Sequence, residues 1–294
     1  MPWTEVMIRV DRAGVTAAER CLEALGAAAV TLEDDADHPV LEPGPGETPL
    51  WPTVSVRGLF DAAVDRAGVL EALRAVPGAQ KPGRVHWRSL DDRDWVRAWM
   101  DRFEPMRFGA RLWVVPTGMD DPDDPAAVLL RLDPGLAFGT GTHPTTALCL
   151  EWLADRDMAG ASVLDYGCGS GILAIAAAKL GASRVVAVDN DPQALEATRL
   201  NAERNGVADR IRCVAPEAFE AGEFDVVVAN ILAGPLIELA PLIVSNATRQ
   251  GFLVLSGLLE EQVGTVSAAY RLHCRVRETV TREGWSRVVL EKTA

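Results

Sequence analysis

The alternation of apolar and polar residues divides the 294-residue chain into two parts. In the first part, alternating segments such as 53–60 predict strands, and apolar residues at helical spacing in 16–27 predict a helix that ends at a glycine. The order expected over residues 1–90 is strand, helix, strand, strand, helix, strand. These elements fall at 3–10, 16–27, 28–35, 53–60, 61–76 and 83–90.

Two strands around an acidic loop are expected first, and from residue 162 the pattern changes to strands that alternate with helices. Strands are expected at 106–116, 127–138, 162–166, 183–191, 211–219, 224–232 and 249–259, and a final pair over 273–292 that turns at Glu283-Gly284. Helices are expected at 145–156, 171–181, 192–206, 234–247 and 260–270. The order of the first part is that of a small ferredoxin-like α+β domain. The second part predicts an α/β, Rossmann-like doubly wound parallel sheet with a mixed edge.

Residues 91–106 separate the two parts and predict a linker helix. Trp95, Trp99 and Phe103 lie four residues apart, on one helical face. We expect this stripe to pack on a neighbouring domain; contact with substrate is the alternative. The sequence therefore predicts a domain at 1–90, a linker at 91–106 and a second domain at 107–294.

The amino-acid composition and net charge limit the classes of function that are expected. Hydrophobic residues make up 48% of the chain and charged residues 24%, as in soluble globular proteins. The net charge of −13 argues against direct binding to DNA or RNA, which requires a basic surface, and is compatible with a basic protein partner. No apolar run reaches the ~20 residues of a membrane span, and no signal-peptide pattern opens the chain. We therefore expect a cytoplasmic protein that binds no membrane.

Cysteine and histidine spacing adds two expectations. The five cysteines and four histidines are scattered, without a CxxC pair or metal-ligand spacing. We expect reduced thiols and no metal site. Nothing in the sequence demands an oligomer, and we expect a monomer.

A glycine-rich turn gives the strongest chemical signal. Gly167, Gly169 and Gly171 form GxGxG between a predicted strand and a predicted helix, whereas a dinucleotide site has GxGxxG. Asp165 precedes the turn. A carboxylate at this position suits a ligand with a cationic amino-acid tail better than a ligand with a phosphate. Asp189 ends the next strand, where an acid accepts hydrogen bonds from ribose hydroxyls. This constellation resembles motif I and the following acidic position of class I S-adenosylmethionine-dependent methyltransferases.

Asn230 ends the fourth predicted strand of the sheet, at the edge where such sheets bind ligands. Its side-chain oxygen can accept an N–H bond from an incoming amine and so point the nitrogen lone pair at a methyl group. A helix cap is the alternative. The position resembles the Asn of the Asn-Pro-Pro-Tyr motif of amino-group methyltransferases, but Ile231-Leu232-Ala233 replaces the rest. Without the tyrosine, an aliphatic amine is favoured over a nucleobase.

The segment LDPGLAFGTGTHPTT, residues 132–146, precedes the helix that leads into this sheet. We expect it to fold over the cofactor, with Phe138 covering apolar surface. His143 is a candidate base, although a histidine before proline more often shapes a loop by hydrogen bonding. Hydroxyls for the cofactor's carboxylate or for a helix cap are expected from Thr142, Thr145 and Thr146.

These segments resemble the PrmA family of methyltransferases, whose substrate is the large-subunit ribosomal protein numbered eleven. The matching motifs are 94–114, 132–146, 165–182, 201–207 and 227–241. The resemblance covers residues 90–294, and the first ninety residues match in architecture. The acidic loop Asp34–Glu47 departs from the family, and its role is not assigned.

The resemblance implies a substrate-recognition domain, a flexible linker and a catalytic domain that methylates lysine side chains and the N-terminal α-amine, up to trimethylation. It implies S-adenosyl-L-methionine as cofactor. Family cofactor contacts map onto Thr146, Gly167, Asp189 and Asn230.

The expected reaction is direct in-line displacement, in which an amine nitrogen attacks the sulfonium methyl. Positioning supplies much of the catalysis, and a lysine with a pKa of about 10.4 must first lose a proton. No general base is identified. Three alternatives stay open: the same chemistry on another basic protein or a small amine, a nicotinamide-dependent oxidoreductase, and a non-enzymatic ribosome-assembly factor with a relic pocket. The GxGxG spacing and Asp165 argue against the oxidoreductase.

Overall fold

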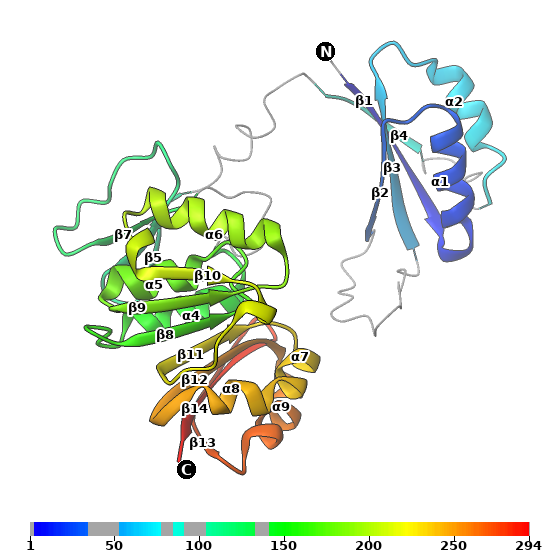
Figure 1. The fold of residues 1–294 in the computed structure, drawn as a ribbon. Coiled ribbons are helices and arrows are strands. Elements are labelled where there is room, and N and C mark those ends of the chain that lie inside the picture. Colours follow the sequence, from blue (N-terminus) through cyan, green and yellow to red (C-terminus); the bar gives the residue numbers. More distant parts are fainter. Residues whose placement is uncertain (1–2, 35–52, 78–84, 91–103, 133–140, 294) are drawn as a thin grey trace. The chain divides into compact units, whose positions relative to one another are not determined.

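The computed structural model describes residues 3–34, 53–77, 85–90, 104–132 and 141–293. The chain forms two compact units, Met1–Trp99 and Met100–Ala294 (Figure 1). Most of the predicted linker, with its stripe of Trp95, Trp99 and Phe103, lies outside the described residues, as does the acidic loop after Asp34. The linker helix and the predicted domain boundaries therefore stay predictions.

The N-terminal unit is a four-stranded antiparallel sheet in the order β2-β3-β1-β4, with two helices on one face (Figure 1). Val6, Ile8 and Val10 alternate toward these helices and form the core with Leu22 and Phe60. The ferredoxin-like prediction is confirmed. The elements are β1 (Trp3–Asp11), α1 (Val15–Ala24), β2 (Ala29–Asp34), β3 (Thr53–Asp61), α2 (Arg66–Leu73) and β4 (Val85–Leu90).

The second helix of this unit begins later than its sequence predicts. Asp61 ends β3 and its carboxylate accepts a hydrogen bond from the Ala63 amide. Asp65 is the N-cap of α2, and its Oδ1 accepts from the Ala67 amide at 3.1 Å. Because both aspartates satisfy nearby amides, the first one closes a turn and only the second one starts the helix.

The second unit is built on a seven-stranded sheet in the order β10-β9-β8-β11-β12-β14-β13. The strands from β10 to β12 are parallel, and β14 runs antiparallel to both of its neighbours. The doubly wound sheet with a mixed edge is therefore confirmed. Its strands are β8 (Ser162–Tyr166), β9 (Arg184–Val188), β10 (Ile211–Val214), β11 (Phe224–Asn230), β12 (Ala247–Leu259), β13 (Cys274–Arg282) and β14 (Trp285–Lys292).

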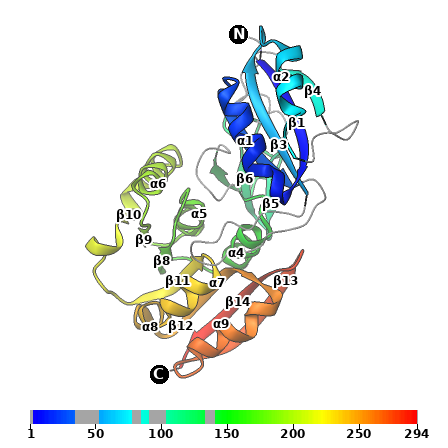
Figure 2. The same cartoon turned by 90° about the vertical axis from the view of Figure 1, so that its right-hand side faces the viewer.

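Helices cover both faces of this sheet (Figures 1 and 2). Val163 of β8 points into the core beneath one set of helices, and the next residue, Leu164, points into the core beneath the other set. The first set is α4 (Pro144–Ala154), α5 (Ile172–Leu180) and α6 (Pro192–Arg204). The second set is α7 (Ala233–Glu238), α8 (Ala240–Ser245) and α9 (Val263–Tyr270). Single 3₁₀ turns lie at Arg12–Gly14, Ala208–Arg210, Pro216–Ala218 and Glu260–Gln262.

Two expected elements are each divided. The strand expected at 106–116 is two strands, β5 (Met106–Phe108) and β6 (Leu112–Val115), because Gly109 turns the chain with a φ of +57°. With β7 (Val128–Arg131) they form a separate three-stranded sheet. The single helix expected at 234–247 is instead two helices, α7 and α8, which are separated at Leu239.

Asn205, the C-cap residue of α6, ties the small sheet to that helix. Its Oδ1 accepts from the Arg131 amide at 2.7 Å, and its Nδ2 donates to the Arg131 carbonyl at 2.8 Å. The end of β7 is thereby held just before the segment that leads to α4. Among the described residues, no helix is long and apolar enough to cross a membrane.

A bulge in β12 makes room for the turn after β11. The register between β12 and β14 shifts between Ser256 and Leu258, and Gly257 has a φ of +86°. A Cβ at Gly257 would lie 2.3 Å from the carbonyl oxygen of Ile231. Only glycine fits this position, because both the backbone conformation and the space exclude a side chain.

Substitution of this glycine should therefore be costly. We expect Gly257→Ala to lower the free energy of unfolding by about 1–3 kcal/mol. The matched control is Gly264→Ala in α9, where a Cβ would meet no atom within 4 Å. Because alanine favours a helix, the control should be neutral or stabilising by up to about 1 kcal/mol. Chemical denaturation of the two variants measures the difference, and equal stabilities would contradict this role.

Candidate functional site

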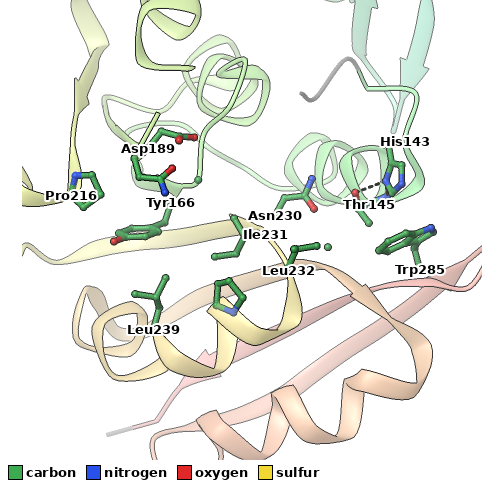
Figure 3. Close-up of a pocket in the computed structure, with 14 residues that line it drawn as sticks. His143, Thr145, Tyr166, Asp189, Pro216, Asn230, Ile231, Leu232, Leu239 and Trp285 are labelled. Atoms are coloured by element: carbon green, nitrogen blue, oxygen red, sulfur yellow. Dashed lines mark hydrogen bonds between the residues drawn. The ribbon is translucent and has the colours of Figure 1, made fainter. Parts of the chain in front are cut away.

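A cavity of about 540 Å³ lies beyond the carboxyl ends of β8, β9 and β11. Because these strands are parallel, the residues that follow them gather at one edge of the sheet. The cavity is lined mainly by apolar side chains with a few polar groups, as small-molecule sites are. One end is formed by Tyr166, Asp189 and Pro216, the other by His143 and Trp285, and Asn230 and Ile231 lie between them (Figure 3).

The glycine turn after β8 is shaped by its own backbone and by Ile231. Gly167, Gly169 and Gly171 have φ values of +84°, +54° and +79°, which favour glycine. A Cβ on Gly167 would lie 2.3 Å from the Cγ2 atom of Ile231. The absent side chain therefore admits Ile231 as well as leaving the backbone at the cavity wall.

Asp189 lies just after β9 and ties this strand to the glycine turn. Its Oδ2 accepts from the Gly169 amide at 2.9 Å, and its Oδ1 accepts from the Asp191 amide at 3.0 Å. The two bonds fix the orientation of the carboxylate at the cavity wall. Each oxygen keeps acceptor capacity for a ligand hydroxyl.

Asp165 is 1% exposed, and it does not line the cavity. Its Oδ2 accepts from the Ala174 amide at 3.0 Å, whereas its Oδ1 has no hydrogen-bond partner among the described residues. Burial, with a smaller contribution from the nearby charge of Asp189, raises the pKa of Asp165 to about 7. A buried acceptor of this kind suits a cationic neighbour.

The side-chain amide of Asn230 is oriented by helix α4. Its Nδ2 donates to the Thr146 Oγ1 at 3.2 Å, so Oδ1 is the atom that remains to accept a hydrogen bond from a ligand. The helix-cap alternative for Asn230 is wrong, because Leu232 is the residue at the N-cap of α7 and makes no side-chain cap bond.

His143 is the N-cap of α4. Its Nδ1 accepts from the Thr145 amide at 3.4 Å and lies 2.7 Å from the Thr145 Oγ1. Partial burial lowers the pKa of His143 below its ordinary value, against a smaller opposing effect of Glu283. The histidine thus shapes the start of the helix, and its ring also lines the cavity.

The structure brings four of the predicted site residues to the cavity wall: Thr145, Gly167, Asp189 and Asn230. Four others lie behind that wall or away from it, among them the buried Asp165. Gly169 reaches the site through Asp189, Thr146 is fully buried behind Asn230, and Thr142 is exposed and does not line the cavity. Phe138 lies outside the described residues. The roles assigned to all of these residues stay predictions.

Several lining residues were not expected from the sequence. Pro216 follows β10 outside any motif, and Trp285 begins a strand far along the chain. Leu239 lies within the family motif 227–241, but no role was assigned to it. Tyr166 lies within the glycine motif, but the sequence analysis assigned it no role. In the described part of the chain, no group of three His, Cys, Asp or Glu residues is arranged to hold a metal ion, and all five cysteines are free.

Comparison with known proteins gives consistent matches. The family model described as ribosomal protein L11 methyltransferase (PrmA) matches residues 2–293. The ribosomal protein L11 methyltransferase of Aeromonas hydrophila is 50% identical over 289 residues, which cover 98% of each chain. That of Escherichia coli is 50% identical over 295 residues, which cover 99% of this chain and 100% of the relative.

A solved structure extends this likeness to the fold. The ribosomal protein L11 methylase of Lactobacillus delbrueckii subsp. bulgaricus is 32% identical, with a TM-score of 0.60, and the match covers 65% of this chain and 100% of that chain. The resemblance stated from the motifs is therefore confirmed: this chain belongs to the ribosomal protein L11 methyltransferase (PrmA) family.

Proposed function

We propose that this protein transfers methyl groups from S-adenosyl-L-methionine to lysine side chains and to the N-terminal amine of large-subunit ribosomal protein L11. The observation that carries the proposal is the Asn230 amide. Its nitrogen is engaged by Thr146, and its oxygen is left to receive an amine N–H at a cavity that also holds Asp189. Membership of a methyltransferase family argues against the oxidoreductase alternative.

The residues present fit this cofactor. Asp189 offers acceptors for ribose hydroxyls beside the apolar surface of Tyr166, Pro216 and Leu239, which suits a base. Asp165 is buried just before the glycine turn and does not line the cavity, so its proposed effect on the ammonium of the amino-acid tail is electrostatic and not a direct contact. When bound, the cofactor supplies an electrophilic sulfonium methyl.

The chain's own residues then orient the acceptor. Asn230 Oδ1 accepts an N–H of the amine. An amide oxygen does not remove the proton. The apolar lining favours the neutral amine over the ammonium, because burial penalises charge. Loss of the proton to solvent therefore precedes attack.

We propose that residues 1–90 form the domain that selects the substrate. Residues 91–106 are then the linker, and residues 107–294 are the catalytic domain. The net charge of −13 favours a basic protein partner such as a ribosomal protein. We also propose that the protein is a cytoplasmic monomer that binds neither DNA nor membranes.

The role of Asn230 predicts a specific kinetic change. Asn230→Ala should lower kcat for methylation of unmodified L11 by about 100-fold or more, because the amine loses its orientation. The affinity for S-adenosylmethionine should change by less than about threefold, because the acceptor and not the cofactor is the principal partner. Mass spectrometry of intact L11 and calorimetric titration measure the two quantities.

Asp189→Ala is the matched control. It removes the acceptor at the other end of the cavity, so cofactor affinity should fall by about tenfold to a hundredfold. If instead Asn230→Ala loses cofactor binding and keeps its rate at saturation, the proposed division of roles is wrong.

Asp165 predicts a dependence of stability on pH. Its pKa is raised from 3.8 to about 7 in the folded chain, so between these values the folded chain keeps a proton that the unfolded chain has released. The free energy of unfolding therefore falls as the pH rises between these two values, by up to about 1.4 kcal/mol per pH unit. Asp165→Asn should therefore be more stable than the unmodified chain at pH 8.

The gain in stability of Asp165→Asn should shrink as the pH falls toward 4, because there the side chain at position 165 is neutral in both folded proteins. Denaturant unfolding of the two chains without cofactor, at pH values between 4 and 8, measures the difference. A constant difference across this range would show that Asp165 is ionised throughout. The same substitution should weaken cofactor binding at pH 8, because the charge that is proposed to attract the ammonium is lost.

A further inference from the structure

The end of the cavity remote from Asp189 is aromatic. Trp285 begins β14, and its ring centroid lies 4.8 Å from that of His143 at an interplanar angle of 70°. Both rings line the same cavity as Asn230 (Figure 3). Leu232, which is 51% exposed, adds apolar surface beside them. None of the described residues that line the cavity is a lysine or an arginine.

Repeated methylation of one nitrogen changes what can hold it. A neutral primary amine has two N–H groups, its monomethyl form has one, and its dimethyl form has none. Asn230 Oδ1 can accept a hydrogen bond only from an N–H, so it can orient the amine for the first two transfers but not for the third. A third transfer requires a different contact to hold the nitrogen.

Aromatic rings provide such a contact. Methyl groups pack against a ring by dispersion, and a methylated ammonium is attracted to the face of an indole. The lowered pKa of His143 keeps that ring uncharged at neutral pH, so it does not repel a cation. The T-shaped contact with His143 fixes the orientation of the indole at the cavity wall.

We propose that Trp285, held by His143, forms the subsite for the dimethylated and trimethylated nitrogen and thereby sets how many methyl groups the enzyme adds. The proposal rests on the proposed function and deepens it. In the third transfer the lone pair of the neutral dimethylamine forms the new N–C bond. The C–S bond breaks, its electron pair stays on sulfur, and the products are a quaternary ammonium and S-adenosylhomocysteine.

The test uses the full-length protein with two L11 substrates, one unmodified and one whose amines have been dimethylated chemically beforehand. The first reports the early transfers, and the second reports the third transfer alone. Single-turnover rates at saturating S-adenosylmethionine are read from the intact mass. Trp285→Leu keeps an apolar side chain without a π-face, and Trp285→Phe keeps a smaller π-face.

Trp285→Leu should slow the third transfer about tenfold more than the first, so that dimethylated L11 accumulates. Trp285→Phe should lie between Trp285→Leu and the unmodified enzyme. Asn230→Ala should show the reverse pattern, with a larger loss on the unmodified substrate. Cofactor titration and thermal denaturation of each variant identify a loss that comes from misfolding.

The outcomes separate the two claims. If Trp285→Leu slows all transfers by the same factor, or by none, the subsite is wrong while the methyltransferase function stands. If the unmodified enzyme transfers no methyl group to either substrate, the proposed function itself fails.

Discussion

The hydrogen bond from Asn230 Nδ2 to Thr146 Oγ1 joins strand β11 to helix α4 across 84 residues of sequence. It decides which end of the amide faces the cavity, and the proposed chemistry depends on that choice. An amide oxygen accepts from an amine and leaves its lone pair for attack, whereas an amide nitrogen would compete for that lone pair. Thr146 is fully buried, so water does not replace it in this contact.

The surrounding backbone is built to keep this corner in place. Ile231 follows Asn230 and fits between two glycines, with its side chain against Gly167 and its carbonyl against Gly257. Tyr270 of α9 donates to the Leu236 carbonyl at 2.7 Å and fixes α7 beneath the same turn. These contacts come from β8, β12 and α9, so the position of the acceptor site depends on the whole sheet and not on one loop.

Much of the site could be predicted from sequence, because parallel strands bring their carboxyl ends to one edge. Asp189 and Asn230 each end a strand that the apolar pattern marks clearly, and both line the cavity. The three glycines of the turn were identified from the sequence. Gly167 was expected only as a family cofactor contact, and the structure shows that its missing side chain also makes room for Ile231.

What the sequence could not predict involves contacts between distant elements. Trp285 reaches the cavity only because β14 inserts antiparallel between β12 and β13, and no local pattern marks it as a site residue. Thr146 was expected to contact the cofactor, and the structure places it behind Asn230. Short helices were also misjudged. The helix expected at 61–76 starts only after Asp65, and the helix expected at 234–247 is two helices, α7 and α8.

The most direct test of this account is the rate of methyl transfer to L11 at saturating S-adenosylmethionine by Thr146→Val and Thr146→Ser. Valine keeps the shape of threonine but lacks the acceptor oxygen, and serine keeps that oxygen. The account predicts that Thr146→Val is slower by about tenfold or more with unchanged cofactor affinity, and that Thr146→Ser retains most of the rate. Equal rates in the two variants, or a loss confined to cofactor affinity, would contradict it.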